Sequence, residues 1–520
     1  MMLSLVTGVL AAALTLAAVV AQGVRWLRVL QREHYAPRPL LRFVGRWNST
    51  PLLGSSKLPG KTPLLLATLQ IAVIVTLVVL GFELVAVVLL SIGAWFLPLG
   101  LGRRGRTSPL AWTRRLRTVA VVASLVDLVI AGSGFAFGHP AATAAVGILA
   151  VPFAVAFAAL VTAPFEDRLA QSFVAQARER LVRVAPTVVA ITGSYGKTST
   201  KHHLAELLGS RHGIVPTPRS FNNRAGLSRA INENLTDGST VFIAEMGTYG
   251  LGEIAALCEW CPPTLSVVTS IGPVHLERMK SLENIATAKY EITERASTVV
   301  LNTDDPILAS WVDRLNAEGK RVVTAGSVSE ASVRVVSEAE RWLIIRDGVT
   351  VAEVLPVAGV HETNLACAIA AAFELGADPY EVATRISHLT PAQHRLTVVT
   401  APSGLTIIDD TFNANPASAR SALALLGSIP SAGRRVVVTP GLIELGPEQE
   451  AANVTVGRDV AALGATLISV ARTNAGALRT GFGTSCEAFA TRELAVSWVR
   501  ANLGATDVVL YLNDLPDHYP

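Results

Sequence analysis

The most constraining feature of this sequence is an almost uncharged apolar run from Thr62 to Leu101. A helix needs about 20 apolar residues to cross a hydrocarbon core about 30 Å thick, so the run is long enough for two crossings. A tight turn near Gly81-Phe82-Glu83 would separate them. Together with other apolar runs, it predicts a bundle of about five transmembrane α-helices. The predicted spans lie near residues 3–22, 63–81, 83–101, 119–136 and 141–162.

The first span has a rival interpretation as a cleaved signal peptide, whose apolar segment normally follows a basic stretch. No basic residue precedes this run, so we interpret it as a retained helix. Charged residues make up 16% of the chain, against about 25% in soluble proteins. The apolar excess lies in the first third, and the remainder has the composition of a globular protein.

Basic residues predict how these helices are oriented, because cytoplasmic loops are enriched in Lys and Arg. They lie between the first and second spans and between the third and fourth, and are absent from the turns near Gly81 and Gly138. Their positions are Arg25, Arg28, Arg32, Arg38, Arg42, Arg46, Lys57, Lys61, Arg103, Arg104, Arg106, Arg114, Arg115 and Arg117. This pattern puts the N-terminus outside and everything after Thr162 in the cytoplasm. It predicts a multi-pass plasma-membrane protein, and we expect no nucleic-acid partner.

A nucleotide site is predicted between Pro186 and Gly209. The β-branched run TVVAITG indicates a buried strand, and KTSTKHHLAELLG has helical spacing. A glycine turn between a strand and a helix N-terminus is the setting in which backbone amides bind phosphate. Lys197 would reach the β- and γ-phosphates, and the hydroxyl of Thr198 would face Mg²⁺.

The spacing of this loop is unusual, because Ile191 stands where the common G-x-x-x-x-G-K-[ST] pattern has its first glycine. The shorter T-G-x-x-G-K-T-[ST] form resembles the Mur ligase family. Other segments resemble that family in the same order, from about Pro186 to the C-terminus. They include TPRSFNNRAGL (217–227), VFIAEMGTYG (241–250), SVVTSIGPVHLERMKSLENIATAKY (266–290), GVHETNLACA (359–368) and PAQHRLTVV (391–399).

The run DDTFNANPAS, from Asp409 to Ser418, is most similar to the subfamily that adds D-alanyl-D-alanine to a peptidoglycan precursor. Phe412 replaces the usual tyrosine. The resemblance implies an α/β fold after the membrane helices, with a P-loop central domain and a Rossmann-like C-terminal domain. We expect a transmembrane region at 1–175, the central ATP-binding domain at 176–392 and the C-terminal domain at 393–520.

Site residues are carried over by the same resemblance. Catalytic roles fall to Lys197, Lys289, His275 and Arg395. Nucleotide binding falls to Gly193, Ser194, Gly196, Lys197, Thr198, Ser199, Asn364, Arg395 and Asp410. The implied metal ligands are Thr198, Glu245, His275 and Lys289, the last as a carbamate. The implied substrate-binding residues are Asn222, Asn223, Asn413 and Asn415.

The implied chemistry joins a carboxylate to an amine after ATP converts the carboxylate to an acyl phosphate. Such phosphoryl transfer depends on positioning and charge neutralisation. The resemblance therefore implies ATP, one or two Mg²⁺ ions and a carbamylated Lys289. It also implies a carboxylate-bearing cell-envelope precursor, and an amino acid or dipeptide such as D-Ala-D-Ala as the amine.

The sequence departs from the family at its N-terminus, where soluble Mur ligases carry a domain that grips a UDP-sugar. The predicted helix bundle occupies that place, which favours a lipid-linked acceptor presented at the membrane. Two alternatives remain open: a membrane-bound poly-γ-glutamate-type polymer synthase, and an ATP-driven transporter or sensor. DDTFNANP favours the peptidoglycan ligase over the first, and no coupling motif supports the second.

The four cysteines predict no disulfide framework. Cys258 and Cys261 form a lone C-x-x-C pair, and a zinc site would normally need a second pair. We expect Cys258, Cys261, Cys367 and Cys486 to be packed or half-exposed thiols.

Overall fold

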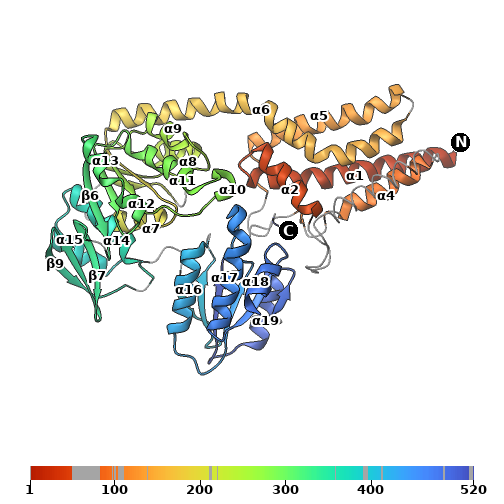
Figure 1. Cartoon of the computed structure of the whole chain (residues 1–520). Helices are drawn as coiled ribbons and strands as arrows, with labels where there is room; N and C mark the ends of the chain where they lie inside the picture. The colour runs from red at the N-terminus through yellow and green to blue at the C-terminus, as the bar shows by residue number, and fades with distance from the viewer. Residues whose placement is uncertain are drawn as a thin grey trace.

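The computed structural model of the chain describes residues 2–49, 76, 82–96, 98, 101–103, 110–137, 139–209, 213–218, 221–328, 330–357, 359–390, 396–411, 414–483, 486–514 and 519. These residues form three parts (Figure 1): a group of N-terminal helices, a central α/β part and a C-terminal α/β part. The N-terminal helices are α1 (Met2–Arg32), α2 (Pro37–Ser49), α4 (Glu83–Phe96), α5 (Arg114–Phe137) and α6 (Pro140–Val184).

Three of the described N-terminal helices are long and apolar enough to cross a membrane, by length and composition. Their candidate spans are residues 12–32, 114–134 and 142–184, and α4 contributes a shorter apolar stretch at 84–95. The predicted span at 63–81 lies outside the described residues apart from Thr76.

Helix α1 extends about ten residues beyond the predicted end of the first span, so Arg25, Arg28 and Arg32 lie on the helix and not in a loop. The reason is visible at Arg25. Its guanidinium donates to the backbone carbonyl of Ala94, in the last turn of α4, at 2.9 Å and to that of Leu101, beyond the end of α4, at 3.0 Å. A charged side chain that caps a neighbouring helix in this way can be buried without ending its own helix.

Helix α6 runs without interruption for 45 residues, from the N-terminal helices to the central part, although Pro152 and Pro164 lie inside it. It ends at Ala185, whose left-handed backbone caps the helix, and the first strand begins two residues later. The predicted last span and the segment after it are therefore one helix.

The central part is a sheet of nine strands in the order β2-β3-β1-β4-β5-β6-β7-β8-β9. The strands are β1 (Thr187–Thr192), β2 (Ile214–Pro216), β3 (Val241–Glu245), β4 (Leu265–Val268), β5 (Thr298–Asn302), β6 (Arg321–Gly326), β7 (Val333–Glu338), β8 (Arg341–Arg346) and β9 (Val349–Val354). Neighbours from β2 to β7 pair parallel, whereas β7, β8 and β9 form an antiparallel meander. The β-branched strands β1, β3 and β4 are buried almost throughout because helices cover both faces.

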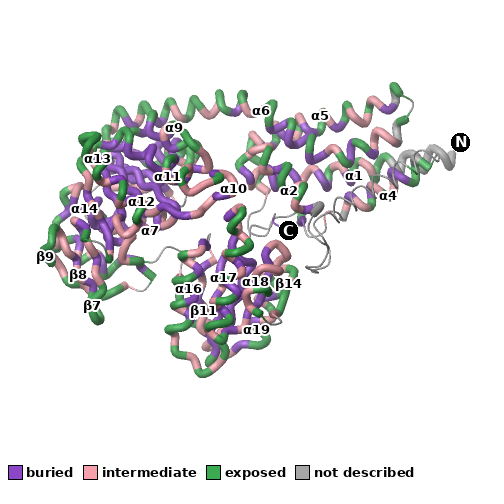
Figure 2. Tube along the Cα trace, in the orientation of Figure 1, coloured by how far each residue is buried: buried purple, intermediate pink, exposed green. Residues whose placement is uncertain are grey.

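Helices on the two faces of this sheet enclose two separate cores. The helices are α7 (Lys197–Leu207), α8 (Arg224–Asn234), α9 (Glu253–Trp260), α10 (Leu276–Met279), α11 (Leu282–Tyr290), α12 (Pro306–Ala309), α13 (Val312–Ala317), α14 (Glu362–Glu374) and α15 (Pro379–Ile386). Helix α14 is buried along nearly its whole length, which its alanine-rich sequence permits. Figure 2 shows the buried residues concentrated around the sheets.

The C-terminal part is a six-stranded sheet in the order β10-β11-β15-β12-β13-β14, parallel except for β10 against β11. The elements are β10 (Thr397–Thr400), β11 (Thr406–Asp410), α16 (Pro416–Ser428), β12 (Arg435–Thr439), α17 (Gln449–Ala462), β13 (Thr466–Val470), α18 (Ala475–Phe482), β14 (Glu487–Phe489), α19 (Arg492–Asn502) and β15 (Val508–Leu512). Strands and helices alternate, which agrees with the predicted Rossmann-like domain, and the last strand lies in the middle of the sheet. Beyond it, Tyr519 packs edge-on against Phe43 of α2, with ring centroids 4.8 Å apart.

Candidate active site

The loop between β1 and α7 is shaped by two glycines. Gly193 has a φ of 153° and Gly196 a φ of 81°, values that favour glycine. A Cβ atom on Gly193 would lie 2.0 Å from Oγ1 of Thr269, and one on Gly196 would lie 2.2 Å from Oδ1 of Asn364. The loop is therefore packed closely between β4 and α14, and the predicted residue Asn364 lies directly against it.

In the loop, Ser194 and Lys197 make hydrogen bonds to the backbone, whereas Thr198 and Ser199 are partly exposed. The Ser194 hydroxyl accepts from the backbone N–H of Gly272 at 2.8 Å and donates to its carbonyl at 3.0 Å, which ties the loop to the segment after β4. The Lys197 ammonium folds back over the loop and donates to the carbonyl of Gly193 at 2.6 Å. Thr198 and Ser199 follow in the first turn of α7 and are partly exposed.

Glu245 ends β3 and is 1% exposed. One carboxylate oxygen accepts from the Lys201 ammonium at 3.0 Å, and the other accepts from the Asn222 amide at 3.2 Å. The structure thus brings together two predicted residues, Glu245 and Asn222. Lys201 was missed by the sequence reasoning. The sequence feature that could have identified Lys201 is its position one helical turn after Lys197, on the face of α7 that faces β3.

Lys289 lies on α11 and is 3% exposed. Burial, and to a smaller degree the charge of nearby Lys197, lower the pKa of Lys289 well below the usual range of a lysine. Within the described part of the chain, its amine has no hydrogen-bond or ion-pair partner. A buried amine beside a second cation is costly unless an anion joins them, so an anionic group fits this position.

His275 precedes α10 in a left-handed conformation with a φ of 52°. Its Nδ1 pairs with a carboxylate oxygen of Glu444, in the C-terminal part, and its ring packs edge-on against Tyr249 with centroids 4.5 Å apart. Sequence reasoning missed Glu444, which lies 169 positions away. No group of three or more His, Cys, Asp or Glu side chains among the described residues is arranged to hold a metal ion.

The remaining predicted residues are held by local contacts. Asn223 caps α8 by accepting from Gly226 N–H at 2.9 Å, and Asn415 caps α16 by accepting from Ala417 and Ser418. Asp410 is buried at the end of β11, where it accepts from Leu396 N–H at 3.3 Å. Arg395 and Asn413 lie outside the described residues.

A charged residue of the C-terminal part acts on the loop electrostatically. Burial raises the pKa of Tyr195, and the positive charge of Arg420 on α16 acts in the opposite direction. An arginine from the second α/β part therefore lies within electrostatic range of the loop, although the sequence reasoning did not single it out.

The cysteines are packed thiols, as predicted. Cys258, Cys261 and Cys367 are buried free thiols and Cys486 is partly exposed. Burial raises the pKa of Cys258 to about 12, which is typical of an unreactive thiol.

Comparisons with known proteins agree with this geometry. The sequence model of the Mur ligase middle domain matches residues 191–372, and that of the Mur ligase glutamate ligase domain matches residues 394–512. A protein of Mycobacterium tuberculosis named UDP-N-acetylmuramoyl-tripeptide–D-alanyl-D-alanine ligase is 34% identical over 362 residues, which cover 64% of this chain and 71% of the relative.

Two solved structures share the fold. MurF from Acinetobacter baumannii matches with a TM-score of 0.58 and 22% identity, over 67% of this chain and 78% of that one. MurF ligase from Thermotoga maritima, in complex with ADP, matches with a TM-score of 0.57 and 23% identity, over 66% of this chain and 80% of that one. The chain therefore belongs to the Mur ligase family of ATP-dependent ligases, which form carbon–nitrogen bonds in peptidoglycan synthesis.

Proposed function

We propose that this protein is a membrane-anchored ligase that adds an amino acid or a dipeptide such as D-Ala-D-Ala to the carboxylate of a peptidoglycan precursor. One observation carries the proposal. The buried amine of Lys289 lies near Lys197 of the glycine loop, in a chain of the Mur ligase family. Two neighbouring amines beside a glycine loop suit a site that binds the phosphates of ATP.

In the proposed reaction, the residues of the chain would bind the phosphates of ATP and position the reacting groups. Lys197 and the N-terminus of α7 hold the β- and γ-phosphates, and Asn364 fixes the loop that presents them. The acceptor carboxylate attacks the γ-phosphorus and ADP leaves, and the amine then attacks the acyl phosphate, so that phosphate leaves and the amide bond forms. Arg395, which precedes β10, would reach the transferred group when the two α/β parts close.

Magnesium and a carbamate fit the donors present. Thr198 and Glu245 offer the oxygen ligands that Mg²⁺ prefers, while Lys201 and Asn222 orient the Glu245 carboxylate. The ion supplies neutralisation of phosphate charge when bound. The lowered pKa of Lys289 favours the neutral amine, which is the form that reacts with CO₂ to give a carbamate. His275, held by Glu444, would be the remaining ligand of the proposed set.

The described surface of the N-terminal helices supports membrane anchoring. Only 22% of the residues in the apolar window of α5 are buried, and Leu128 and Val129 are 66% and 71% exposed. Exposed apolar surface of this kind on long helices suits lipid better than water. With the N-terminus outside, both α/β parts lie in the cytoplasm. We propose to divide the chain into a transmembrane region at 1–175, an ATP-binding domain at 176–392 and a C-terminal domain at 393–520.

The acceptor is proposed to be lipid-linked. The first family match begins at residue 191, and the N-terminal helices precede it. An acceptor held in the bilayer would reach a ligase anchored in the same bilayer without diffusing through the cytoplasm.

Turnover of the purified full-length protein tests the function. We expect ADP release that requires ATP, a muramoyl-tripeptide acceptor and D-Ala-D-Ala, and loss of that release in Lys197→Ala. Surface residue Lys280 lies outside the loop, and Lys280→Ala is the matched control. Unchanged turnover in Lys197→Ala would remove the loop from the mechanism. Activity with L- or D-glutamate in repeated additions would support the polymer synthase, and ATP hydrolysis without any acceptor would support the transporter or sensor.

A further inference from the structure

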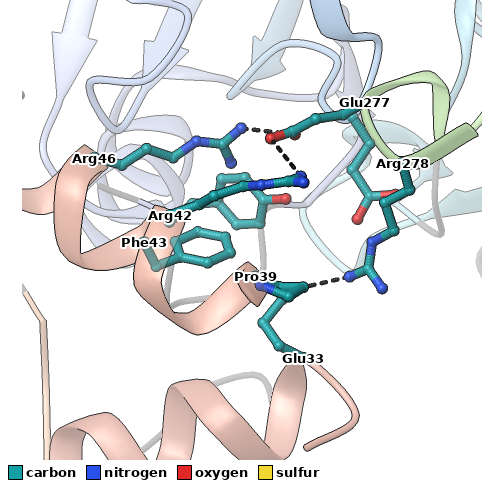
Figure 3. A pocket seen from close by; sticks show the side chains of 9 residues that line it. Glu33, Pro39, Arg42, Phe43, Arg46, Glu277 and Arg278 are labelled. Carbon is teal, nitrogen blue, oxygen red and sulfur yellow. Dashed lines mark hydrogen bonds and ion pairs between the residues drawn. The ribbon is translucent and has the colours of Figure 1, made fainter. Parts of the chain in front are cut away.

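A pocket lies where the three parts of the molecule meet (Figure 3). The loop around α10 forms one wall, α2 and the end of α1 form another, and the C-terminal part closes it with Glu444 and Tyr519. Arg42, Arg46 and Arg278 line it. No residue proposed above for ATP, metal or amine binding lines this pocket, so its role is open.

The N-terminal wall of the pocket is docked firmly on the ligase. Glu33, at the end of α1, accepts from Arg278 at 2.6 Å, and the two side chains are only 6% and 20% exposed. His34 and Tyr35 turn the chain sharply with φ values of 54° and 63°. The His34 ring packs against Tyr249, with centroids 5.2 Å apart. The corner between α1 and α2 therefore has a fixed position relative to the loop that carries His275.

The pocket is next to the proposed reaction centre. Glu444 lines it and pairs with Nδ1 of His275, and the Glu444 carbonyl accepts from Glu277 N–H at 3.4 Å. A molecule in the pocket would thus be separated from His275 by a single side chain. This is a suitable place for the remote end of an acceptor whose carboxylate lies at the reaction centre.

The pocket wall carries three arginines and three carboxylates, those of Glu33, Glu277 and Glu444, and the donors left for an anionic ligand are on α2. Arg42 and Arg46 are one helical turn apart on α2, and both point at the same carboxylate, that of Glu277. Arg46 takes the short contact at 2.7 Å and leaves Arg42 with a single contact at 3.4 Å in the described structure. Arg42 keeps N–H donors for a ligand, and guanidinium groups bind phosphate oxygens in pairs.

The position of α2 fits a ligand at the membrane face. Leu40, Phe43 and Trp47 on its apolar side are buried among the N-terminal helices, while Arg42 is exposed. The helix begins five residues after the candidate span of α1 ends. Basic amphipathic helices in such positions face lipid head groups.

We propose that this pocket binds the diphosphate of the acceptor, with Arg42 and Arg46 as its ligands. The proposal rests on the proposed ligase function. A diphosphate links the sugar both in a polyprenyl-linked acceptor and in a nucleotide-linked one, and the pocket recognises the group that they share.

Binding measurements on the full-length protein in detergent test the proposal, with saturating ADP present so that the nucleotide loop is filled. The probes are farnesyl diphosphate for the lipid-linked source, UDP for the nucleotide-linked source and farnesol as the probe without phosphate. We expect Arg42→Ala to weaken diphosphate binding roughly tenfold, as loss of a charge-assisted contact implies. Arg46→Ala should act in the same direction. Arg38, on the same helix but outside the pocket, provides the control Arg38→Ala.

Each outcome decides a separate point. Binding of farnesyl diphosphate alone indicates a lipid-linked acceptor, binding of UDP alone indicates a nucleotide-linked one, and dependence on Arg42 in either case supports the pocket. The proposal is overturned if neither diphosphate binds, if Arg42→Ala binds as the wild type does, or if Arg38→Ala weakens binding equally. Arginine-dependent binding without any amide formation would instead refute the proposed function and leave the site standing. Thermal unfolding of each variant checks that it is folded.

Discussion

The ammonium of Lys201 lies 3.0 Å from a carboxylate oxygen of Glu245, and the two side chains are only 5% and 1% exposed. The pair joins the helix after the glycine loop to the strand beside it. Because both side chains are removed from water, each depends on the other, and the carboxylate proposed for Mg²⁺ is fixed in place.

Lys201→Met should destabilise the protein by about 3–5 kcal/mol, because it leaves the Glu245 carboxylate buried without its cation. The measurement is urea-induced unfolding of the detergent-solubilised protein. Arg229→Met breaks an exposed pair with Glu233 and should cost less than about 1 kcal/mol. Adding Glu245→Gln to Lys201→Met should recover part of the loss. Equal effects of Lys201→Met and Arg229→Met on the free energy of unfolding would show that the buried pair stabilises the protein no more than the exposed pair does.

Lys289→Arg should lower turnover by roughly 100-fold or more, on the scale of losing one electrostatic contact to the transition state. Arginine has a side chain of similar length but stays protonated, so it cannot form a carbamate. Steady-state ADP release measures the effect, and Lys320→Arg, at a lysine that contacts only backbone carbonyls, is the control. Wild-type protein should also lose activity in CO₂-free buffer and regain it with bicarbonate. A fully active Lys289→Arg variant would contradict the carbamate.

Lys289→Met should stabilise the nucleotide-free protein in CO₂-free buffer with EDTA, most strongly at low pH. The folded state lowers the pKa of Lys289, so the unfolded chain binds the proton more tightly. Burial of the amine is therefore most costly below its folded pKa. The cost declines by up to about 1.4 kcal/mol per pH unit and vanishes near the ordinary lysine value of about 10.4. Unfolding curves of both proteins across pH give the difference, and a gain that does not fall as pH rises would refute this assignment.

Exchanging the charges of Glu33 and Arg278 tests whether the N-terminal helices are docked on the ligase. Glu33→Arg and Arg278→Glu should each lower stability by about 2 kcal/mol or more, because each leaves a largely buried charge beside one of like sign. The double exchange should restore much of the loss. Thermal unfolding and the KM for the acceptor are measured together. Additive losses in the double variant would mean that the two side chains do not interact.

The glycine loop was predictable because its determinants are local. A buried strand, two glycines and a helix start lie within about twenty consecutive residues, and the positive φ values of Gly193 and Gly196 follow from that order. Lys201 was equally local, but its importance comes from Glu245, 44 positions away. Only the folded sheet brings these two side chains together.

The contacts between parts could not have been predicted in the same way. The pairing of His275 with Glu444, and of Arg278 with Glu33, joins residues separated by 169 and 245 positions. No periodicity in the sequence encodes such a distance. The end of α1 could not be predicted from hydropathy either, because the apolar run ends before Arg25 whereas the helix continues to Arg32. The carbonyls that make this possible belong to α4 and to Leu101 beyond its end.

Helix α6 sets a fixed distance in this molecule. Its 45 residues correspond to about 68 Å along the helix axis, from the N-terminal helices to two residues before the strand that leads into the glycine loop. A continuous helix, unlike a flexible linker, fixes the separation between the two parts that it joins. In the proposed membrane-anchored arrangement, this helix would set the height of the catalytic centre above the membrane and so favour substrates whose reactive carboxylate stands at that distance from the lipid.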